Sequence, residues 1–333
     1  MNQASRLLLA LMLATALVAC GDDTSSSDAG AADAADASGD GDGGGDGDGD
    51  GDGDGDDDGG SEPEAFLAPA GDGWHTLVTG DWTLPADTES YRCARVTIPE
   101  DTYISALKPV TPPGTHHTLL SIDEVPKHDD GVEDCGAFDN GARQIGSSGV
   151  GSNPYELPEG VAMELRAGWQ VTLNLHLFNT GEDELRGESG VLVKTNPKAD
   201  VTDKAETVLA GPVVLDIPPG RVVQSGTCTF THDATIFSVF PHMHQTGVYM
   251  KITAHSSTQG DVSLFDGEYS FDNQAIHILD LIDMKEGDTV DVECTYQNDR
   301  EETIMWGDSS LDEMCFAGLG RFPPGEPMLG CLE

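Results

Sequence analysis

The stretches ELRAGWQVTLNLHLFN (residues 164–179) and DMKEGDTVDVECTYQN (residues 283–298) have the same outline. Each begins with a short charged turn that ends in glycine and continues as a long run in which apolar and polar residues alternate. Alternation with a period of two is typical of a β-strand that buries one of its faces. Two such units, far apart in one chain, indicate two halves that are built in a similar way.

Other segments alternate in the same manner, and turn-forming proline, glycine, aspartate and asparagine residues separate them. No long stretch has the 3.6-residue period of an amphipathic helix. Many short antiparallel strands bury their apolar faces by packing in two layers. This predicts an all-β fold of two tandem antiparallel β-sandwich domains, jelly-roll-like, at residues 64–200 and 201–333. Further predicted strands are YRCARVTI (91–98), SGVLVKT (189–195), ETVLAGPVVLDI (206–217), IFSVFPHM (236–243) and YMKITAH (249–255).

Residues 1–20 have the proportions of a secretory signal, since Arg6 precedes an apolar run too short to span a bilayer as a helix. The end of this run, LVAC, resembles the lipobox of bacterial lipoproteins, which implies cleavage before Cys20 and acylation of that cysteine. An ordinary signal peptide that is cut elsewhere is the alternative. The lipobox implies an extracytoplasmic protein, attached to a membrane of the bacterial cell envelope only through its lipid anchor.

Residues 21–63 contain almost only glycine, aspartate, alanine and serine, with a Gly-Asp repeat from Gly39 to Asp56. Nothing there offsets the chain entropy that is lost on ordering, so we predict a disordered Asp/Gly-rich tether. Gly-Asp repeats also bind calcium in ordered β-rolls, but those need apolar residues at fixed spacing, which are missing here. The formal net charge of -44 argues against nucleic acid and anionic lipid as partners.

Setting Cys20 aside leaves an even number of cysteines, which suggests disulfides in an exported chain. Six cysteines allow fifteen pairings, and sequence alone does not choose among them. A division near residue 200 gives two cysteines to the first half and four to the second. If every bridge stays within its own half, Cys93 pairs with Cys135. The six are Cys93, Cys135, Cys228, Cys294, Cys315 and Cys331.

Histidine and methionine side chains stand in four short motifs: GTHHTLL and LNLHLFN in the first half, FPHMH and DSSLDEMC in the second. Residues i and i+2 of a strand share a face, so the histidines of FPHMH lie side by side, whereas the adjacent pair of GTHHTLL converges only at a bulge or strand end. Imidazole suits copper, zinc, iron and nickel, and thioether sulfur favours Cu(I). The motifs therefore suggest two unequal copper sites. The candidate ligands are His116, His117 and His176 in one half, and His242, His244 and Met314 in the other.

Each motif alone also fits a structural role, because a histidine in an apolar strand is often a hydrogen-bonded core residue and methionine is a common core filler. Their order along the chain, however, resembles the copper type II, ascorbate-dependent monooxygenases. That family includes peptidylglycine α-hydroxylating monooxygenase and dopamine β-monooxygenase. The resemblance extends from about Trp82 to Cys331, and Tyr91, Cys93 and the segment LAGPVVLDIPPG fit it as well.

The resemblance implies two copper ions, O2, and a one-electron reductant such as ascorbate, with the two sites on either side of a solvent-filled cleft between the sandwiches. It implies that the all-histidine site supplies electrons. It also implies that the site with the methionine activates oxygen, which makes His242, His244 and Met314 the catalytic residues. The disulfides it implies are Cys93–Cys135, Cys228–Cys331 and Cys294–Cys315, the last of which would fix the strand that presents Met314.

The chain departs from the peptide-hydroxylating branch of the family at the positions that hold the peptide carboxylate. That branch has an arginine two residues before the HxH motif, and an asparagine and a tyrosine two and four residues after the methionine. Here these positions are Phe240, Phe316 and Gly318. An apolar wall does not pair with a carboxylate, and an unpaired buried charge is costly. We therefore predict a small apolar or aromatic substrate, in a pocket that includes Tyr91, Phe240 and Phe316.

The predicted function is a copper-dependent monooxygenase that hydroxylates a C–H bond of a small organic molecule. A non-catalytic copper-binding or copper-storage surface lipoprotein is the main alternative, and a purely structural sandwich with buried histidines is a third. We expect Asp312 and Glu313 to orient the Met314 loop rather than to act as acid or base. No role is predicted for the remaining histidines, which are His75, His128, His232, His255 and His277.

Overall fold

The computed structural model describes residues 66–325 and the backbone of residues 331 and 332. These residues form β-strands and loops with one short 3₁₀ helix, Lys198–Asp200, and no α-helix. The predicted all-β class is confirmed. None of the described residues forms an apolar helix of membrane-spanning length. The predicted signal segment 1–20 with Cys20 and the predicted tether 21–63 lie outside the described residues.

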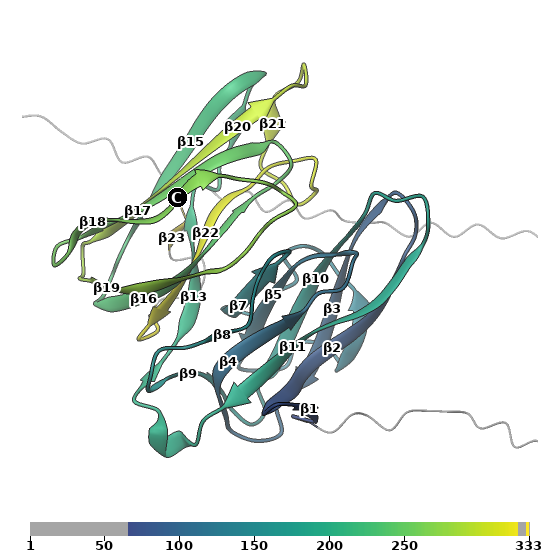
Figure 1. The fold of residues 1–333 in the computed structure, drawn as a ribbon, viewed down its shortest axis with the longest axis vertical. Helices are drawn as coiled ribbons and strands as arrows, with labels where there is room; N and C mark the ends of the chain where they lie inside the picture. The colour runs from purple at the N-terminus through teal and green to yellow at the C-terminus, as the bar shows by residue number, and fades with distance from the viewer. Residues whose placement is uncertain (1–65, 326–330, 333) are drawn as a thin grey trace, which may run out of the picture. The chain divides into compact units, whose positions relative to one another are not determined.

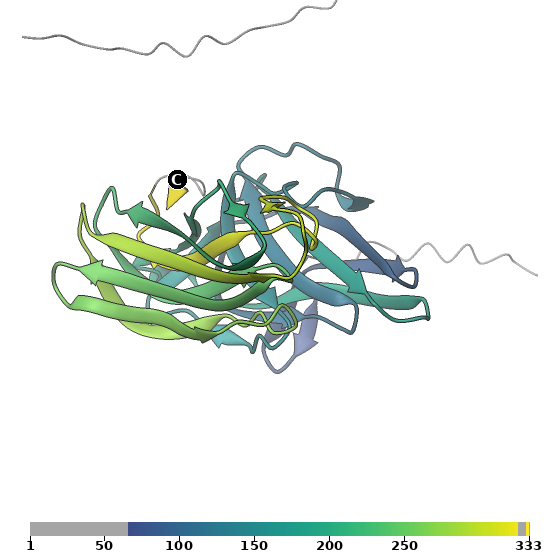
Figure 2. The ribbon, with the colours of Figure 1, turned by 90° about the horizontal axis from the view of Figure 1, so that it is seen from above.

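Figures 1 and 2 show the strands gathered in two groups, the earlier ones in blue shades and the later ones in green and yellow. The first group consists of β1 (Pro69–Gly71), β2 (Trp74–Leu84), β3 (Thr88–Thr97), β4 (Thr102–Val110), β5 (Thr115–Asp123), β6 (Gly131–Asp134), β7 (Arg143–Gly149), β8 (Tyr155–Glu156), β9 (Val161–Leu165), β10 (Gln170–Asn179) and β11 (Leu185–Thr195). The later strands are β12 (Asp203–Lys204), β13 (Glu206–Gly211), β14 (Asp216–Ile217), β15 (Gly220–Thr229), β16 (Ala234–Met243), β17 (Gly247–Ser256), β18 (Gly260–Glu268), β19 (His277–Met284), β20 (Thr289–Asn298), β21 (Ile304–Met305), β22 (Cys315–Phe322) and β23 (Cys331–Leu332).

The two stretches that predicted the fold form matching turns before matching strands. Each turn is closed by a backbone hydrogen bond across four residues, 3.0 Å long in the first and 2.9 Å in the second. Gly168 has a φ of 86° and Gly287 a φ of 92°, a region that favours glycine because it lacks a Cβ. The turns lead into β10 and β20, which each have a partner strand on both sides.

The sheets pack as layers around two hydrophobic cores. A seven-stranded sheet has the order β1-β2-β11-β4-β9-β12 with β8 paired to β4, and a four-stranded sheet has the order β15-β20-β17-β18. A ten-stranded sheet, β19-β16-β22-β13-β7-β5-β10-β3-β6 with β23 paired to β13, contributes to both cores. Strand pairing is antiparallel except for β12 with β9 and β13 with β23. The described residues all belong to one compact unit, Gly60–Glu333, so a domain boundary at residue 200 stays a prediction.

The halves join in the ten-stranded sheet, where β7 pairs with β13 through Gln144 and Thr207. Beside this pair, the buried carboxylate of Glu206 contacts Arg143 and accepts hydrogen bonds of 3.0 and 2.8 Å from Arg321. Removing one partner of a buried ion pair leaves an uncompensated charge and costs about 3–5 kcal/mol. The Glu206 network therefore stabilises the register in which the two halves share one sheet.

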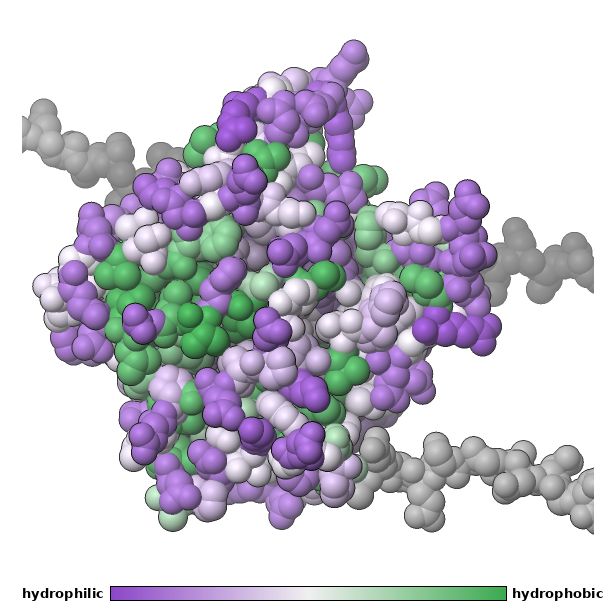
Figure 3. Space-filling model, in the orientation of Figure 1, coloured by the Kyte–Doolittle hydropathy of each residue, from purple (hydrophilic) through white to green (hydrophobic). Residues whose placement is uncertain are grey.

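The edge strand β19 carries much of a hydrophobic area that Figure 3 shows on one face of the molecule. Ile278 is 51% exposed and Leu281 is 48% exposed on this strand. Asp280 and Asp283 alternate with them. Charged residues on an edge strand oppose pairing with a strand of another chain.

Candidate functional site

His116, His117 and His176 lie together on β5 and β10, and we call them the nitrogen-only group. Between these strands His176 pairs with His117 and Leu177 pairs with Thr115, so His116 is an extra, unpaired residue. Such a bulge redirects a side chain that a regular strand would point to the opposite face. The adjacent histidines therefore converge at a β-bulge, which is one of the two irregularities predicted from the sequence as necessary for this.

The Nδ1 atoms of the three rings approach one another. Nδ1 of His117 lies 3.2 Å from Nδ1 of His116 and 3.3 Å from Nδ1 of His176. One ligand atom from each of the three lies within 4.8 Å of the others. Two nitrogens about 2.0–2.1 Å from a shared ion, at a tetrahedral angle, lie roughly 3.3 Å apart. The spacing fits three imidazoles around one metal ion.

In two of these rings, the Nε2 nitrogen lies within hydrogen-bond distance of an acceptor oxygen. Nε2 of His116 lies 2.8 Å from the carbonyl oxygen of Phe271, and Nε2 of His176 lies 2.7 Å from a carboxylate oxygen of Glu89. An acceptor at Nε2 favours the tautomer that carries its proton there, which leaves the Nδ1 lone pair free for a metal. Both lone pairs are thus directed toward the centre that His117 also faces.

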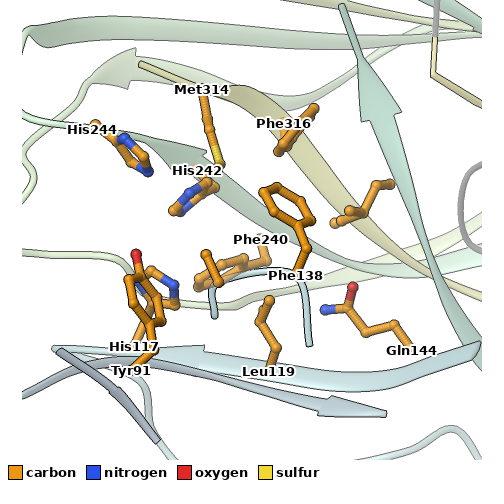
Figure 4. Close-up of a pocket in the computed structure, with 13 residues that line it drawn as sticks. Tyr91, His117, Leu119, Phe138, Gln144, Phe240, His242, His244, Met314 and Phe316 are labelled. Atoms are coloured by element: carbon orange, nitrogen blue, oxygen red, sulfur yellow. The ribbon is translucent and has the colours of Figure 1, made fainter. Parts of the chain in front are cut away.

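His242, His244 and Met314 form a second cluster, which we call the mixed group. Here Nδ1 is the engaged nitrogen, because Nδ1 of His242 lies 2.9 Å from the side-chain oxygen of Gln274 and Nδ1 of His244 lies 3.2 Å from the carbonyl oxygen of Asp312. These acceptors leave the Nε2 lone pairs available. Figure 4 shows the sulfur of Met314 pointing toward His242. Two nitrogens and one sulfur make a donor set unlike the first.

The backbone of the mixed group is held by Glu313, which is fully buried. Its carboxylate accepts hydrogen bonds from the backbone N–H groups of His244 and Thr246, at 2.9 and 2.6 Å, and from the hydroxyl of Thr246 at 2.7 Å. On the other side, the hydroxyl of Tyr296 donates to the carbonyl oxygen of Met314 at 2.7 Å. The Met314 loop is therefore tied to the histidine segment by side-chain and main-chain contacts.

Two disulfides lie between described side chains, Cys93–Cys135 and Cys294–Cys315, with Cα–Cα distances of 5.8 and 5.9 Å. Cys315 directly follows Met314 at the start of β22, so the second bridge joins the Met314 end of that strand to β20. The side chain of Cys331 is not among those described, and the pairing Cys228–Cys331 stays a prediction.

The two histidine groups are in contact rather than separated. The ring centroids of His117 and His242 lie 5.0 Å apart. A loop of the second half closes the gap, because Ser310 donates to the carboxylate of Glu89 through its backbone N–H at 3.0 Å and its hydroxyl at 3.1 Å. The expectation of a solvent-filled cleft between the two sites is wrong for this structure, since loops of the second half pack onto the ligand strands of the first.

Burial favours the neutral form of the histidines. It lowers the pKa of His116 to about 3 and that of His244 to about 4, and the neighbouring His176 adds to the effect on both. Burial also lowers the pKa values of His117 and His242 well below the usual value. Neutral imidazole is the form that binds a metal, so these rings are ready to do so at neutral and mildly acidic pH.

A pocket with a volume of about 50 Å³ adjoins both groups, as Figure 4 shows. Alternation along β16 and β22 explains one wall, where Phe316 pairs with His242 and Gly318 pairs with Phe240. Apart from the histidines, Tyr91 and one glutamine, the lining residues are apolar. All three residues predicted for a substrate pocket line it.

Tyr91 contributes its ring rather than its hydroxyl to this pocket. The ring stacks on His176 with a centroid distance of 4.5 Å, and the hydroxyl donates to the carbonyl oxygen of Asp308 at 2.9 Å. The tyrosine thus packs the His176 ring of the nitrogen-only group in place and connects the two halves of the chain.

Several residues of the site were missed from the sequence. Glu89 lies two residues before the predicted pocket tyrosine on β3, so the shared strand face is a signal that could have found it. Phe271 and Gln274 stand in an irregular segment between β18 and β19, where no period indicates which side chain points inward. Phe138 and Gln144 also line the pocket, Phe138 from the loop between β6 and β7 and Gln144 from β7, whose pairing with β13 no local pattern predicts.

Solved structures that resemble the chain do so loosely. A protein from Parabacteroides distasonis ATCC 8503 has 10% identity, covers 78% of this chain and 85% of its own, and gives a TM-score of 0.17. The structure of infectious bursal disease virus Gx strain has 11% identity, covers 75% of this chain and 70% of its own, and also gives 0.17. Similarities at this level carry no argument about the fold or the site.

Sequence comparison is more informative. Residues 204–326 match the C-terminal domain of copper type II ascorbate-dependent monooxygenase. The human protein named "Putative DBH-like monooxygenase protein 2" is 24% identical over 282 residues, which are 75% of this chain and 56% of the human protein. The chain therefore spans little more than half the length of that relative. These two matches support the resemblance to the copper type II ascorbate-dependent monooxygenases that the order of the motifs indicates.

Proposed function

We propose that this protein is a copper-dependent monooxygenase that hydroxylates a C–H bond of a small apolar or aromatic molecule, with O2 and a one-electron reductant such as ascorbate. One observation carries the proposal: two different donor sets, 5.0 Å apart between the rings of His117 and His242, meet at one largely apolar pocket. A storage site needs neither the pocket nor unlike donor sets. The similarity of residues 204–326 to a monooxygenase domain supports the same conclusion.

The donor atoms fit copper at both places. The nitrogen-only group would hold one ion through its converging Nδ1 atoms, and the mixed group would hold a second through two Nε2 atoms and the Met314 sulfur. Imidazole nitrogen and thioether sulfur are ligands that copper accepts, the sulfur especially as Cu(I). When bound, copper supplies the one-electron chemistry with O2 that side chains lack.

The chain's own residues orient the ligands and shape the pocket. Glu89 and the Phe271 carbonyl hold the ring tautomers of the nitrogen-only group, and Gln274 does so for His242. Phe240 and Phe316 form an apolar wall beside the mixed group. Such a wall excludes water and binds the apolar body of a substrate with a C–H bond near the mixed group.

A copper-binding or copper-storage protein is the second candidate, because the pocket is small. A volume of about 50 Å³ holds a few water molecules but not an aromatic ring. An aromatic ring enters only if a lining side chain moves. Phe138 is the candidate for this movement, because it is 44% exposed and the other lining residues are more buried. Turnover distinguishes an enzyme from a storage protein.

Copper titration followed by oxygen-uptake measurements tests the proposal. We expect two copper ions per chain and ascorbate-dependent O2 consumption that rises when a small aromatic probe such as p-xylene is added, with a hydroxylated product detected by mass spectrometry. Copper binding without product from a panel of such probes would favour storage. Loss of all copper on dialysis would contradict both functions.

A further inference from the structure

One polar side chain without an assigned role lies in the apolar part of the pocket. Gln144 lines the pocket from β7, at the end opposite His244 in Figure 4. Its side chain is buried, with 1% of the residue exposed. Its Nε2 donates to the carbonyl oxygen of Gly146 at 3.3 Å, while its Oε1 has no hydrogen-bond partner within residues 66–325.

The orientation of this amide follows from its neighbours. If the two ends of the Gln144 amide were exchanged, its oxygen would face the carbonyl oxygen of Gly146, and two acceptors would meet. The strand pairing shifts register between Leu120 and Ser121, opposite Gln144. Such bulges redirect side chains and are frequent beside functional sites. The register shift therefore sets Gln144 into the pocket wall, where its unpartnered oxygen stays enclosed until a lining side chain moves.

A buried amide oxygen without a donor is unfavourable, so a molecule that enters the pocket and supplies a donor to it gains a favourable hydrogen bond. The described residues that line this pocket include no aspartate, glutamate, lysine or arginine. A charged group placed there would lack a counter-charge, which is costly in a low-dielectric site. The matching partner is thus an uncharged donor, a hydroxyl or an N–H group.

We propose that Gln144 determines the specificity of the pocket, and that its Oε1 accepts a hydrogen bond from an uncharged hydroxyl or N–H group at one end of the substrate. This inference rests on the proposed function of the pocket as a substrate site. The apolar body of the substrate then lies against Phe240 and Phe316, and the C–H bond to be hydroxylated lies at the other end, beside the mixed group.

Gln170 is a matched control elsewhere in the first half. It is equally buried, with 1% exposed, but both ends of its amide are satisfied. Its oxygen accepts from the backbone N–H groups of Lys127 and His128, at 3.2 and 3.4 Å, and its nitrogen donates to His128 and Asp130 at 2.8 and 3.1 Å. Gln170 is a structural glutamine that does not line the pocket.

The test compares p-cresol with p-xylene, two probes of similar shape in which a hydroxyl replaces a methyl group. Binding to the copper-free full chain is measured by calorimetry for wild type, Gln144→Leu and Gln170→Leu. We expect the ratio of p-cresol to p-xylene affinity to fall about tenfold or more in Gln144→Leu, because only p-cresol loses its acceptor. The ratio stays unchanged in Gln170→Leu. Thermal unfolding gives a second readout: Gln144→Leu keeps or raises the Tm, whereas Gln170→Leu lowers it.

An unchanged affinity ratio in Gln144→Leu overturns the proposal, as does failure of p-cresol to bind the wild-type chain. A drop in Tm as large as that of Gln170→Leu overturns it too, since Gln144 would then be structural. Copper-loaded protein separates this inference from the proposed function. A binding preference that depends on Gln144 without ascorbate-dependent product overturns the oxygenase function alone. Hydroxylation of both probes with the same kcat/KM ratio in wild type and Gln144→Leu overturns the inference alone.

Discussion

The nitrogen-only group and the mixed group are neighbours that present opposite ring nitrogens to their centres. Acceptors occupy Nε2 of His116 and His176, whereas acceptors occupy Nδ1 of His242 and His244. All members of the mixed group line the pocket, but only His117 of the nitrogen-only group does. Under the proposed function, two metal sites would share one buried neighbourhood, and the mixed group would face the substrate with all three of its side chains whereas the nitrogen-only group would do so with one. Changes in one group should therefore leave the other group's metal in place.

The largest expected effect is that of Met314→Ile. We expect this change to reduce hydroxylation to the background rate, because it removes the sulfur that favours Cu(I) beside the pocket. Copper should remain at the nitrogen-only group, and the fold should survive, since apolar swaps of similar volume usually cost less than about 1.5 kcal/mol. Product formation and copper content per chain are the two measurements.

Met305→Ile is the matched control, because Met305 is 52% exposed and does not line the pocket. It should retain both copper ions and full turnover. Near wild-type turnover in Met314→Ile would contradict the assignment of that sulfur as a ligand. Loss of both copper ions from Met314→Ile would break the comparison itself, since it would show that the two groups bind as one unit.

Acid should lower the folding stability of the copper-free protein through the histidines of both groups. The folded-state pKa is about 3 for His116 and about 4 for His244, below the usual value near 6.5. Between these values the unfolded chain binds protons that the folded chain does not, so stability is lost as pH falls below about 6.5. At pH 5 the loss is of the order of 2 kcal/mol for each such histidine.

Urea unfolding of the copper-free chain at pH 7 and pH 5 measures this loss. His116→Asn removes one buried titrating ring, so the difference in unfolding free energy between pH 7 and pH 5 should become smaller by about the contribution of one histidine. Equal stability of the wild-type chain at both pH values would show that the rings are not held in a buried, neutral form.

For Glu89→Gln we expect a smaller effect, a loss of copper affinity at the nitrogen-only group alone. Burial raises the pKa of Glu89, but hydrogen bonds from His176 and Ser310 outweigh it and hold the pKa below its usual value. A neutral amide no longer fixes the His176 tautomer with its proton on Nε2. We expect copper affinity at the nitrogen-only group to fall about 10- to 100-fold, the usual range for loss of such a partner. Competition titration with a copper chelator measures it.

Affinity at the mixed group should be unchanged in Glu89→Gln, which gives an internal control in the same titration. Glu156→Gln is the external control, because the Glu156 side chain is 70% exposed and pairs with Lys194 on the surface. If Glu89→Gln weakens both copper ions equally, the groups are coupled more tightly than their separate hydrogen-bond partners suggest.

Local periodicity predicted the parts of the site that lie within single strands. The same-face positions of Phe240 and His242, and the bulge needed by His116 and His117, follow from a period of two in β16 and β5. The order of residue types then indicated which strands belong together. The members of the two histidine groups were therefore available from the sequence as candidate ligands, as was the apolar character of the pocket.

The relation between the strands was not available from the sequence. The 5.0 Å approach of His117 to His242 depends on irregular loops, such as the one that brings Ser310 to Glu89. Gln144 enters the pocket because β7 pairs with β13, a contact across the two halves that no local pattern encodes. Both features come from long-range packing, which fixes distances that strand patterns leave free.

The smallest expected effect concerns His255, a half-exposed ring that contrasts with both buried groups. Its Nδ1 lies 2.7 Å from a carboxylate oxygen of Asp261, and its Nε2 lies 3.1 Å from one of Asp291. The hydrogen bond with Asp261, followed by that with Asp291, raises the pKa of His255 above its usual value. Any stability from this pair is full below about pH 6.5 and is lost as pH rises through the raised pKa, the reverse of the trend for the buried rings. An NMR titration of the histidine ring protons should show one resonance that titrates above the usual value, and Asp261→Asn should lower it. If His255 instead titrates below the usual value, as the buried rings do, then differences in exposure and in neighbouring carboxylates do not explain why the pKa values of the buried rings are lowered.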